Sequence, residues 1–235
     1  MNFHYTDNDN CHTATGLVVV IDVIRAFSNA AYAFRVGAES ITLVSGVEEA
    51  LTLKAQMPGA LVMGEVGGLP PAGFDFGNSP TEIVRQDLRG KRLIQRTGAG
   101  TQGAVRSVNA ETLFAARFAV AGATVAAIQC LQPEQVTFVI TGRDFSDEDL
   151  SCAQYLEARL KGQEPDPAPY LERVRKSVEI RHMTGFPNLE SDLDYCTRLD
   201  SCPFAMPITR EHGRPIMRAL TPDTGATYVH PRRKT

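Results

Sequence analysis

The sequence predicts an α/β fold of three layers, in which helices cover both faces of a mixed, largely parallel β-sheet. Short apolar runs rich in β-branched residues recur along the chain, and helical patterns lie between them. Strands that alternate with helices in this way build layered α/β folds. Hydrophobic residues make up 43% of the 235 residues, which is enough to supply a sizeable core. We therefore expect one domain over residues 1–235.

The first predicted strand covers residues 17–21, a continuous apolar and β-branched run that ends before Asp22. A strand without polar alternation is expected to be buried on both faces. Similar runs predict strands at 40–44, 60–63, 92–95, 124–128 and 136–140.

The segments between these runs predict helices at 47–57, 81–87, 104–120 and 147–160. Ser146 precedes the last of them and Asp149 follows three residues later, as in a capping box. The three prolines of residues 162–170 cannot continue that helix, so we expect a surface linker there. A subdomain boundary could fall within residues 161–170.

The remaining chain predicts helices at 171–178 and 189–199, followed by two strands on either side of a turn at 211–214. We expect this pair to be antiparallel and to lie at an edge of the sheet. Residues 230–235 are expected to form a solvated end.

The charge balance argues against several classes of partner. Lys and Arg number 24 against 27 Asp and Glu, so no basic field favours nucleic acid or an anionic membrane. The five cysteines form no CxxC pair and have no zinc-finger spacing, which is typical of reduced thiols. No apolar stretch reaches membrane-spanning length. We expect a cytoplasmic protein, a homo-oligomer, that binds a small anionic phosphorylated substrate.

The first group of candidate catalytic residues is Asp22, Arg25 and Ser28. Open α/β sheets bind ligands beyond the carboxyl ends of their strands, which is where Asp22 is predicted to lie. Arg25 could reach the same crevice and bind phosphate or sulfonate oxygens in pairs. The alternative is that Asp22 caps the next helix and Arg25 neutralises it. Phosphatases with an aspartate nucleophile carry a second aspartate two residues on, where this chain has Ile24, so Asp22 is more plausible as a metal ligand or a base.

The second group lies in residues 64–80, a segment rich in glycine and proline. Its carboxylates Glu65 and Asp75 are hard oxygen ligands suited to Mg²⁺, so the candidate metal ligands are Asp22, Glu65 and Asp75. Asn78 and Ser79 are candidate substrate-binding residues. They could also cap a helix that has Pro80 in its first turn, and both interpretations can hold together.

The third group is the loop at residues 98–103, which matches the dinucleotide pattern GxGxxG. That pattern expects an acid at the end of the next strand, and Gln129 and Cys130 follow the run predicted there. A single phosphate is therefore favoured over a dinucleotide, at a helix N-terminus that aims backbone amides at one point. The candidate phosphate-binding residues are Arg96, Thr97, Gly98, Gly100 and Thr101.

A fourth group is acidic. Residues 147–149 place three acids in the first turn of a predicted helix, where the helix dipole explains them adequately. A metal-binding role for Glu148 or Asp149 is the alternative, if this helix end faces the same crevice.

The ordered set VVVIDVIRAFSNA, GEVGG, GFDFGNSP, RTGAGTQG and DEDLSCAQYLE resembles the 2-phosphosulfolactate phosphatase family. The resemblance implies an α/β fold and Mg²⁺-dependent hydrolysis of 2-phosphosulfolactate to 3-sulfolactate and phosphate, a step of coenzyme M biosynthesis. Matched motif by motif, it implies functional roles for Asp22, Arg25, Ser28, Glu65, Asp75, Asn78 and Ser79. This chain departs from the family at Ala99, Gln102 and Phe27, where asparagine, arginine and a small polar residue are usual. A different organic acid could therefore be the substrate.

Three questions stay open at the level of sequence. Attack by metal-activated water is favoured over a covalent intermediate on Ser28, Asp22 or a cysteine, but both are conceivable. A non-catalytic module that binds a phosphorylated metabolite is one alternative function. A dinucleotide-dependent oxidoreductase is another, which the missing ribose-binding acid disfavours.

Overall fold

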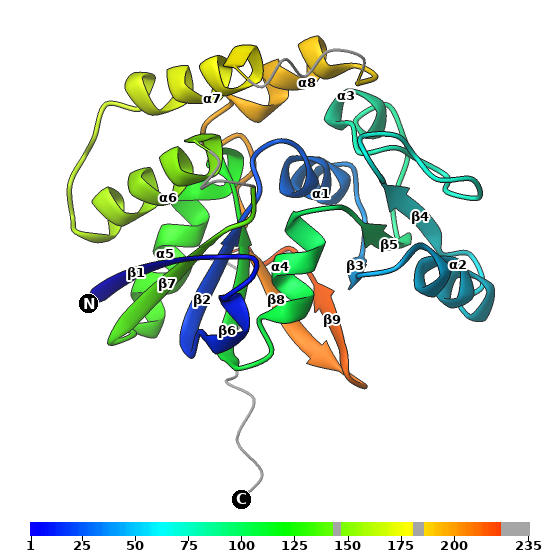
Figure 1. Ribbon diagram of the computed structural model, residues 1–235, viewed down its shortest axis with the longest axis horizontal. Coiled ribbons are helices and arrows are strands. Elements are labelled where there is room, and N and C mark those ends of the chain that lie inside the picture. The colour runs from blue at the N-terminus through cyan, green and yellow to red at the C-terminus, as the bar shows by residue number, and fades with distance from the viewer. Residues whose placement is uncertain (143–146, 181–185, 222–235) are drawn as a thin grey trace, which may run out of the picture.

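The computed structural model describes residues 1–142, 147–180 and 186–221. These residues form one nine-stranded mixed sheet with helices on both faces (Figure 1), which confirms the predicted fold class. The strands are β1 (Asn2–Asp7), β2 (Gly16–Ile21), β3 (Ser40–Val44), β4 (Leu61–Gly64), β5 (Arg92–Arg96), β6 (Ala110–Ala116), β7 (Gln135–Ile140), β8 (Met206–Glu211) and β9 (Arg214–Met217). The α-helices are α1 (Ala26–Arg35), α2 (Val47–Gln56), α3 (Pro80–Ile83), α4 (Gly100–Arg106), α5 (Ala121–Leu131), α6 (Asp147–Leu160), α7 (Ala168–Ile180) and α8 (Leu189–Cys196), with short 3₁₀ turns at Cys11–Thr13 and Phe118–Val120.

The side chains of β2 show why helices cover both faces of the sheet. Val18 and Val20 face the cluster that includes α1 and α4, whereas Val19 and Ile21 face the cluster that includes α5 and α6. All four side chains are fully buried. The continuous apolar run of this strand is thereby explained, because neither face meets water.

The strand order is β1-β7-β2-β6-β8-β9-β3-β5-β4, so the C-terminal hairpin lies in the middle of the sheet. The prediction that these two strands lie at an edge is wrong. β8 pairs antiparallel with β6, and β9 pairs antiparallel with β3, so the hairpin joins two parallel groups of strands. Its apolar side chains, including those of Met206, Ile208 and Met217, are buried in the same cluster as α1.

Three antiparallel pairings separate β6 from β3, so the two parallel groups run in opposite directions along the ladder. The start of α4, which follows β5, nevertheless lies against the end of β2, as the contacts of Gly100 show below.

Two predicted elements differ from the structure in the middle of the chain. The predicted helix 104–120 is instead the end of α4 followed by β6, and the predicted strand 124–128 lies within α5. Both segments are rich in alanine and contain short apolar runs, and such runs do not distinguish a buried strand from a buried helix. The prediction also missed β1, a strand at one edge of the sheet.

Other predicted elements agree closely with the structure. β3 and α6 have the predicted bounds, and the remaining predicted strands and helices differ from β2, β4, β5, β7, α2, α3, α7 and α8 by a few residues at their ends. The predicted linker connects α6 to α7, and α7 packs back on α6 through Tyr155 and Tyr170. The predicted cap Ser146 and the predicted solvated end lie outside the described residues. Within the ranges that are described, none of the helices has the length and apolar character needed to cross a membrane.

Candidate active site

A cavity of about 1070 Å³ opens beyond the carboxyl ends of β1, β2 and β7 and beside the start of α4. Its lining comes from five segments far apart in the sequence, and the parallel pairing of β1, β7 and β2 brings three of them to one edge. Its charge is strongly unbalanced. The described lining carries six carboxylates, from Asp7, Asp9, Asp22, Glu65, Glu148 and Asp149, and one guanidinium, from Arg106.

Asp22 and Asp149 form the centre of this cavity. Asp22 directly follows β2, and Asp149 lies in the first turn of α6; they are 4% and 3% exposed. The hydroxyl of Thr141, which directly follows β7, lies 3.4 Å from Oδ2 of Asp22 and 3.4 Å from Oδ2 of Asp149. The same hydroxyl donates to the carbonyl oxygen of Ile21 at 2.9 Å. The strand-end prediction for Asp22 therefore leads to a pair of carboxylates, with a hydroxyl between them.

Backbone amides fix the orientation of both carboxylates. Ala26 N, the first amide of α1, donates to Oδ1 of Asp22 at 2.9 Å. Asp22 therefore caps α1, which was the alternative interpretation of this residue. Val23 N donates to Oδ1 of Asp149 at 2.7 Å, and Gly142 N donates to its Oδ2 at 3.1 Å. Capping and a role in the site are compatible, because in each case the Oδ2 atom is turned toward Thr141.

The two carboxylates have raised pKa values. Burial and, to a smaller extent, the charge of Glu65 raise the pKa of Asp22 to about 6. Burial and the charge of Asp22 also raise the pKa of Asp149 well above its ordinary value. Two buried acids that destabilise each other's charged form are a common feature of functional sites, and a cation placed between them would relieve the repulsion.

Glu65 closes one side of the cavity by binding the glycine-rich loop. Gly98 N donates to Oε1 of Glu65 at 2.5 Å, and Gly68 N donates to its Oε2 at 2.8 Å. A backbone amide predicted to bind phosphate is thus occupied by a carboxylate. The Gly98 amide therefore has the geometry to bind an anion, and the anion that it binds in this structure is the Glu65 carboxylate.

The two glycines inside α4 are needed because this helix packs directly on the site. A Cβ atom at Gly100 would lie 2.7 Å from Oδ2 of Asp22 and 2.9 Å from the Cβ of Ala26. A Cβ atom at Gly103 would lie 2.6 Å from Oδ1 of Asn8. The GxGxxG pattern thus permits close packing of the start of α4 on the end of β2, a reason independent of any dinucleotide.

The family model described as 2-phosphosulpholactate phosphatase matches residues 3–211 of this chain. The chain belongs to the 2-phosphosulfolactate phosphatase family. A Bacillus subtilis (strain 168) protein named "Probable 2-phosphosulfolactate phosphatase" is 33% identical over 207 residues, which cover 86% of this chain and 91% of the relative. A Thermotoga maritima protein of the same name is 34% identical over 204 residues, covering 81% of this chain and 86% of the relative. The family that the motifs indicated is confirmed.

Two of the family-matched polar residues outside the cavity, Arg25 and Ser79, belong to a buried network around Asp192 of α8. Asp192 is fully buried and pairs with Arg25 at 2.7 Å, while Ser79 Oγ and Thr81 N donate to its other oxygen at 2.8 Å and 2.9 Å. Arg25 also donates to the carbonyl oxygen of Pro187 at 2.8 Å. Arg25 and Ser79 therefore lie together but bind a carboxylate of the protein, and neither lines the cavity. Ser79 also caps α3, as predicted.

The other predicted residues take several positions. Ser28 donates its hydroxyl hydrogen to the carbonyl oxygen of Val23 at 2.5 Å, inside α1. Asn78 is buried, and its Oδ1 has no hydrogen-bond partner among the described residues. Thr97 and Thr101 are buried and bind each other across the first turn of α4. Arg96 donates to the carbonyl oxygens of Ser45 and Glu65.

The structure does not bring Asp75 together with Asp22. The Asp75 carboxylate pairs with Lys54 at 2.7 Å and accepts a hydrogen bond from Val62 N at 2.7 Å, and Asp75 is absent from the described cavity lining. Asp149 lies beside Asp22 instead, so the metal-binding alternative for the start of α6 gains support. Thr141 and Asn8, which line the cavity, were missed, and so was Asp192, which binds Arg25 outside it, because nothing near them in the sequence indicates these contacts.

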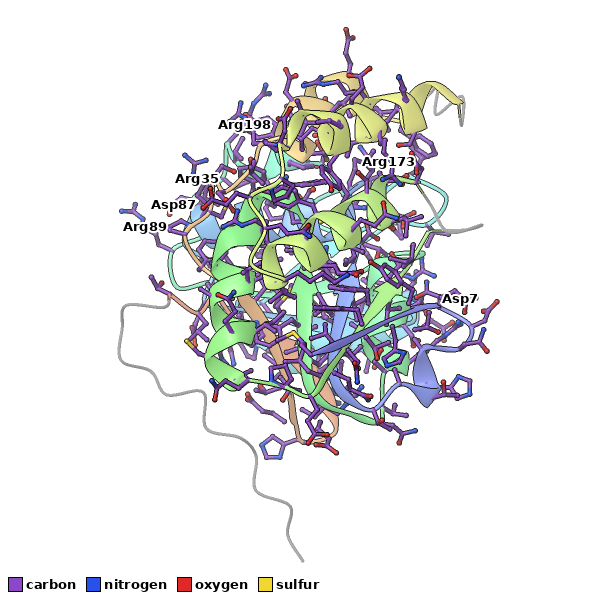
Figure 2. All side chains as sticks on the ribbon, turned by 90° about the vertical axis from the view of Figure 1, so that its left-hand side faces the viewer. Asp7, Arg35, Asp87, Arg89, Arg173 and Arg198 are labelled. Carbon is purple, nitrogen blue, oxygen red and sulfur yellow. The ribbon has the colours of Figure 1, made fainter. Side chains whose placement is uncertain are left out.

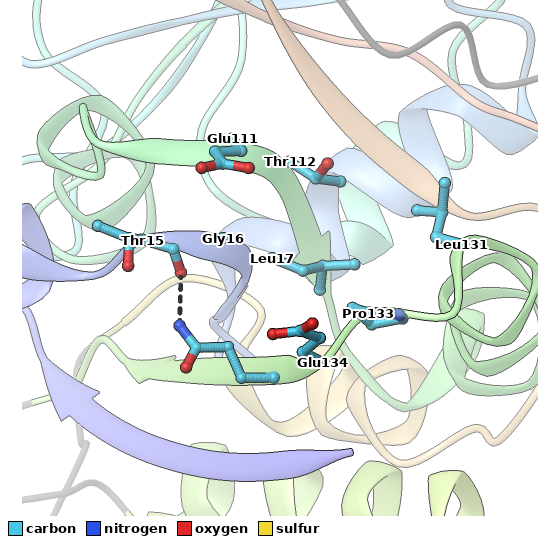
Figure 3. A pocket seen from close by; sticks show the side chains of 9 residues that line it. Thr15, Gly16, Leu17, Glu111, Thr112, Leu131, Pro133 and Glu134 are labelled. Atoms are coloured by element: carbon cyan, nitrogen blue, oxygen red, sulfur yellow. Dashed lines mark hydrogen bonds between the residues drawn. The ribbon is translucent and has the colours of Figure 1, made fainter.

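A second cavity, of about 430 Å³, lies at the opposite end of the first group of strands. Figure 3 shows its lining at the beginnings of β2, β6 and β7, with the carboxylates of Glu111 and Glu134 and the one drawn hydrogen bond, from Gln135 to the carbonyl oxygen of Thr15.

Proposed function

We propose that the protein is a Mg²⁺-dependent phosphatase that hydrolyses 2-phosphosulfolactate to 3-sulfolactate and inorganic phosphate. The observation that carries the proposal is the pair of buried carboxylates, Asp22 and Asp149, at the centre of the cavity. Membership of the phosphatase family and the printed names of the relatives support the reaction class and the substrate.

The donor set fits Mg²⁺. Within the described residues, no three His, Cys, Asp or Glu side chains stand close enough together to hold a metal ion by themselves. Protein-bound Mg²⁺ typically uses one or two carboxylates and completes its coordination with water and substrate phosphate oxygens. Asp22 and Asp149 supply two carboxylates of this kind, and we propose them as the ligands in preference to Asp75. When bound, Mg²⁺ would polarise the phosphoryl group and lower the pKa of a coordinated water molecule.

The residues of the chain would orient the reactants. The amide of Ala26 holds the Asp22 carboxylate, and the amides of Val23 and Gly142 hold that of Asp149. Gly98 N would donate to a phosphate oxygen once the Glu65 carboxylate moves away from it. Transition-state charge on the phosphoryl oxygens is best stabilised by donors that are already oriented, and backbone amides are suited to this role.

We propose water as the nucleophile. The hydroxyl of Ser28 is engaged with the Val23 carbonyl oxygen and lies outside the cavity lining, and four of the five cysteines are buried. Burial raises the pKa of Cys152 and Cys196, the second to about 11, which disfavours thiolate chemistry. Glu148, which is buried and lines the cavity, is the candidate base.

The oxidoreductase alternative loses further support. The strand after the glycine loop is β6, which ends at Ala116 before Arg117, so a ribose-binding carboxylate is missing there too. A binding module that does not turn over its ligand remains the competing proposal. The phosphatase is expected to act in the cytoplasm, in keeping with its free cysteines.

The two proposals are separated by measuring phosphate release from 2-phosphosulfolactate, 2-phospholactate and a monoester without a further acid group. The phosphatase proposal predicts release that requires Mg²⁺ and stops with chelator. Saturable binding of the same compounds without any release would favour the binding module.

A further inference from the structure

The charged groups that line the cavity are mostly carboxylates, which repel an anionic substrate. Six carboxylates line it, and metal binding at Asp22 and Asp149 would neutralise only its centre. The proposed substrate carries a carboxylate and a sulfonate in addition to its phosphate. These groups need a positive partner of their own, because charge complementarity decides which ligands a site accepts.

Arg106 is the cation of the described lining, and its position relative to the centre is defined by α4. This helix begins at Gly100, against the Asp22 carboxylate, and Arg106 is its last residue. Six residues of helix advance the chain by about 9 Å along the axis, and a helical side chain leans back toward the N-terminus. The guanidinium can therefore face a group several ångströms from the phosphate.

The present contacts of Arg106 are long and exchangeable. Its Nη1 atom lies 3.7 Å from Oδ1 of Asp9 and 3.4 Å from the carbonyl oxygen of Asn8, and its side chain is 50% exposed. An exposed ion pair of this kind contributes little, so a bound acid group can replace it without a large cost.

The segment that holds Arg106 is itself fixed to the site. The Asn8 side chain donates to the carbonyl oxygens of Ala99 and Thr141 at 3.2 Å and 3.0 Å. The loop after β1, the glycine loop and the end of β7 thus form one wall. Arg106, which is half exposed, contacts this wall at Asn8, and the buried Asp22 and Asp149 lie against it at Thr141.

We propose that Arg106 determines specificity by binding the second acid group of the substrate, a sulfonate or a carboxylate, while the phosphate lies at Asp22 and Asp149. This inference rests on the proposed function for the identity of the phosphorylated end. A guanidinium suits either acid, because its paired N–H groups match two oxygens at once.

The test is equilibrium binding of 3-sulfolactate, lactate and inorganic phosphate, measured by calorimetry on the Mg²⁺-loaded protein, which needs no turnover. Replacing Arg106 by glutamine should weaken 3-sulfolactate binding about tenfold, the effect expected for one hydrogen-bonded charge. Phosphate binding should stay unchanged, and Arg106→Lys should lose less than Arg106→Gln. Weakening that also appears with lactate assigns the carboxylate to Arg106; weakening confined to 3-sulfolactate assigns the sulfonate.

The matched control is Arg89→Gln, which removes an exposed, aspartate-paired arginine on the opposite side of the molecule from Asp7 in Figure 2. It should bind all three ligands as the wild type does. Unchanged 3-sulfolactate binding in Arg106→Gln, or an equal loss for phosphate, would overturn the inference. If the wild type releases no phosphate from any ester yet binds 3-sulfolactate through Arg106, the proposed function fails and the acid-binding role stands.

Discussion

Asp22 and Asp149 carry most of the chemistry proposed for this site, because each is buried and each turns one oxygen toward the same hydroxyl. Among the described residues, neither carboxylate forms an ion pair with an arginine or lysine. A buried carboxylate pair without such a partner is costly unless it is protonated or bound to a cation. The protein therefore keeps a local destabilisation that a metal ion would relieve.

The first prediction concerns which carboxylates hold Mg²⁺. Asp22→Asn and Asp149→Asn should each weaken Mg²⁺ binding at least tenfold in calorimetric titrations, because each removes one of two charged ligands. Asp75→Asn should bind Mg²⁺ as the wild type does, since Asp75 is engaged with Lys54. Loss of binding in Asp75→Asn with retention in Asp149→Asn would contradict this ligand set.

The second prediction concerns pH and the metal-free protein. The pKa of Asp22 is about 6 in the folded protein against an ordinary value of 3.8, so between these values the folded state binds more protons than the unfolded state. Stability from this group is therefore present at low pH and is lost as pH rises toward 6. In chelator, we expect Tm of the wild type relative to Asp22→Asn to fall by roughly 4–8 °C between pH 4.5 and pH 7.5.

The comparison with Asp22→Asn is needed because Asp7, Asp87 and Glu211 have lowered pKa values and act in the opposite direction. Saturating Mg²⁺ should remove most of the difference at pH 7.5. If the Tm difference does not change with pH, or increasingly favours the wild type as pH rises, then charging Asp22 does not destabilise the folded protein.

Some residues of the site could be predicted from the sequence, and others could not. Asp22 could be predicted because a buried strand ends immediately before it, and Ser79 because Pro80 follows it in a helix start. Thr141 and Asp192 could not, because Asp22 and Ser79, the candidate site residues that they contact, stand more than 100 residues away in the chain. Arg25 was predicted to bind substrate oxygens in the crevice beside Asp22, and in the structure it pairs with Asp192 instead.

At the scale of elements, α4 packs closely on the site because its residues Gly100 and Gly103 have no side chain. Gly100 and Gly103 let the helix approach Asp22, Asn8 and Val20 closely enough that a methyl group has no room at either position. The sequence pattern predicted a glycine-dependent loop at this point. It did not reveal that packing against β2 is one of the reasons for the glycines.

The third prediction tests this packing with Gly100→Ala. The new Cβ would displace the Asp22 carboxylate, so we expect a loss of about 1–3 kcal/mol in the free energy of unfolding and weaker Mg²⁺ binding. Urea unfolding and calorimetry measure the two effects. Gly46→Ala is the control, because a Cβ at that helix start would meet nothing closer than 3.7 Å. Wild-type values for Gly100→Ala would mean that α4 does not pack on the site.

The fourth prediction concerns the docking of α8. Asp192→Ala leaves Arg25 buried without its carboxylate, and breaking a buried pair typically costs about 3–5 kcal/mol. Asp194→Ala removes an exposed acid from the same helix and should change the free energy of unfolding little. Equal effects of the two substitutions in urea unfolding would argue against a central role for the Asp192 network.

At the scale of the whole molecule, the fold consists of two parallel groups of strands joined by a C-terminal hairpin. The fold class and most elements followed from alternating apolar runs, because strand burial and helix periodicity are local properties. The position of the hairpin did not follow, since strand order depends on which open edges meet. The same dependence explains why the cavity combines β1, β7 and α4, elements that no local pattern links.

The central claim is that this arrangement hydrolyses a phosphate ester with Mg²⁺ held at Asp22 and Asp149. The most direct test is inorganic phosphate release from 2-phosphosulfolactate by the wild type and by Asp22→Asn, each with Mg²⁺ and with chelator. The account predicts that the wild type releases phosphate with Mg²⁺ and not with chelator. It also predicts that the rate of release by folded Asp22→Asn is at least a hundredfold lower. Release that persists in chelator, or near-normal release by Asp22→Asn, would contradict it.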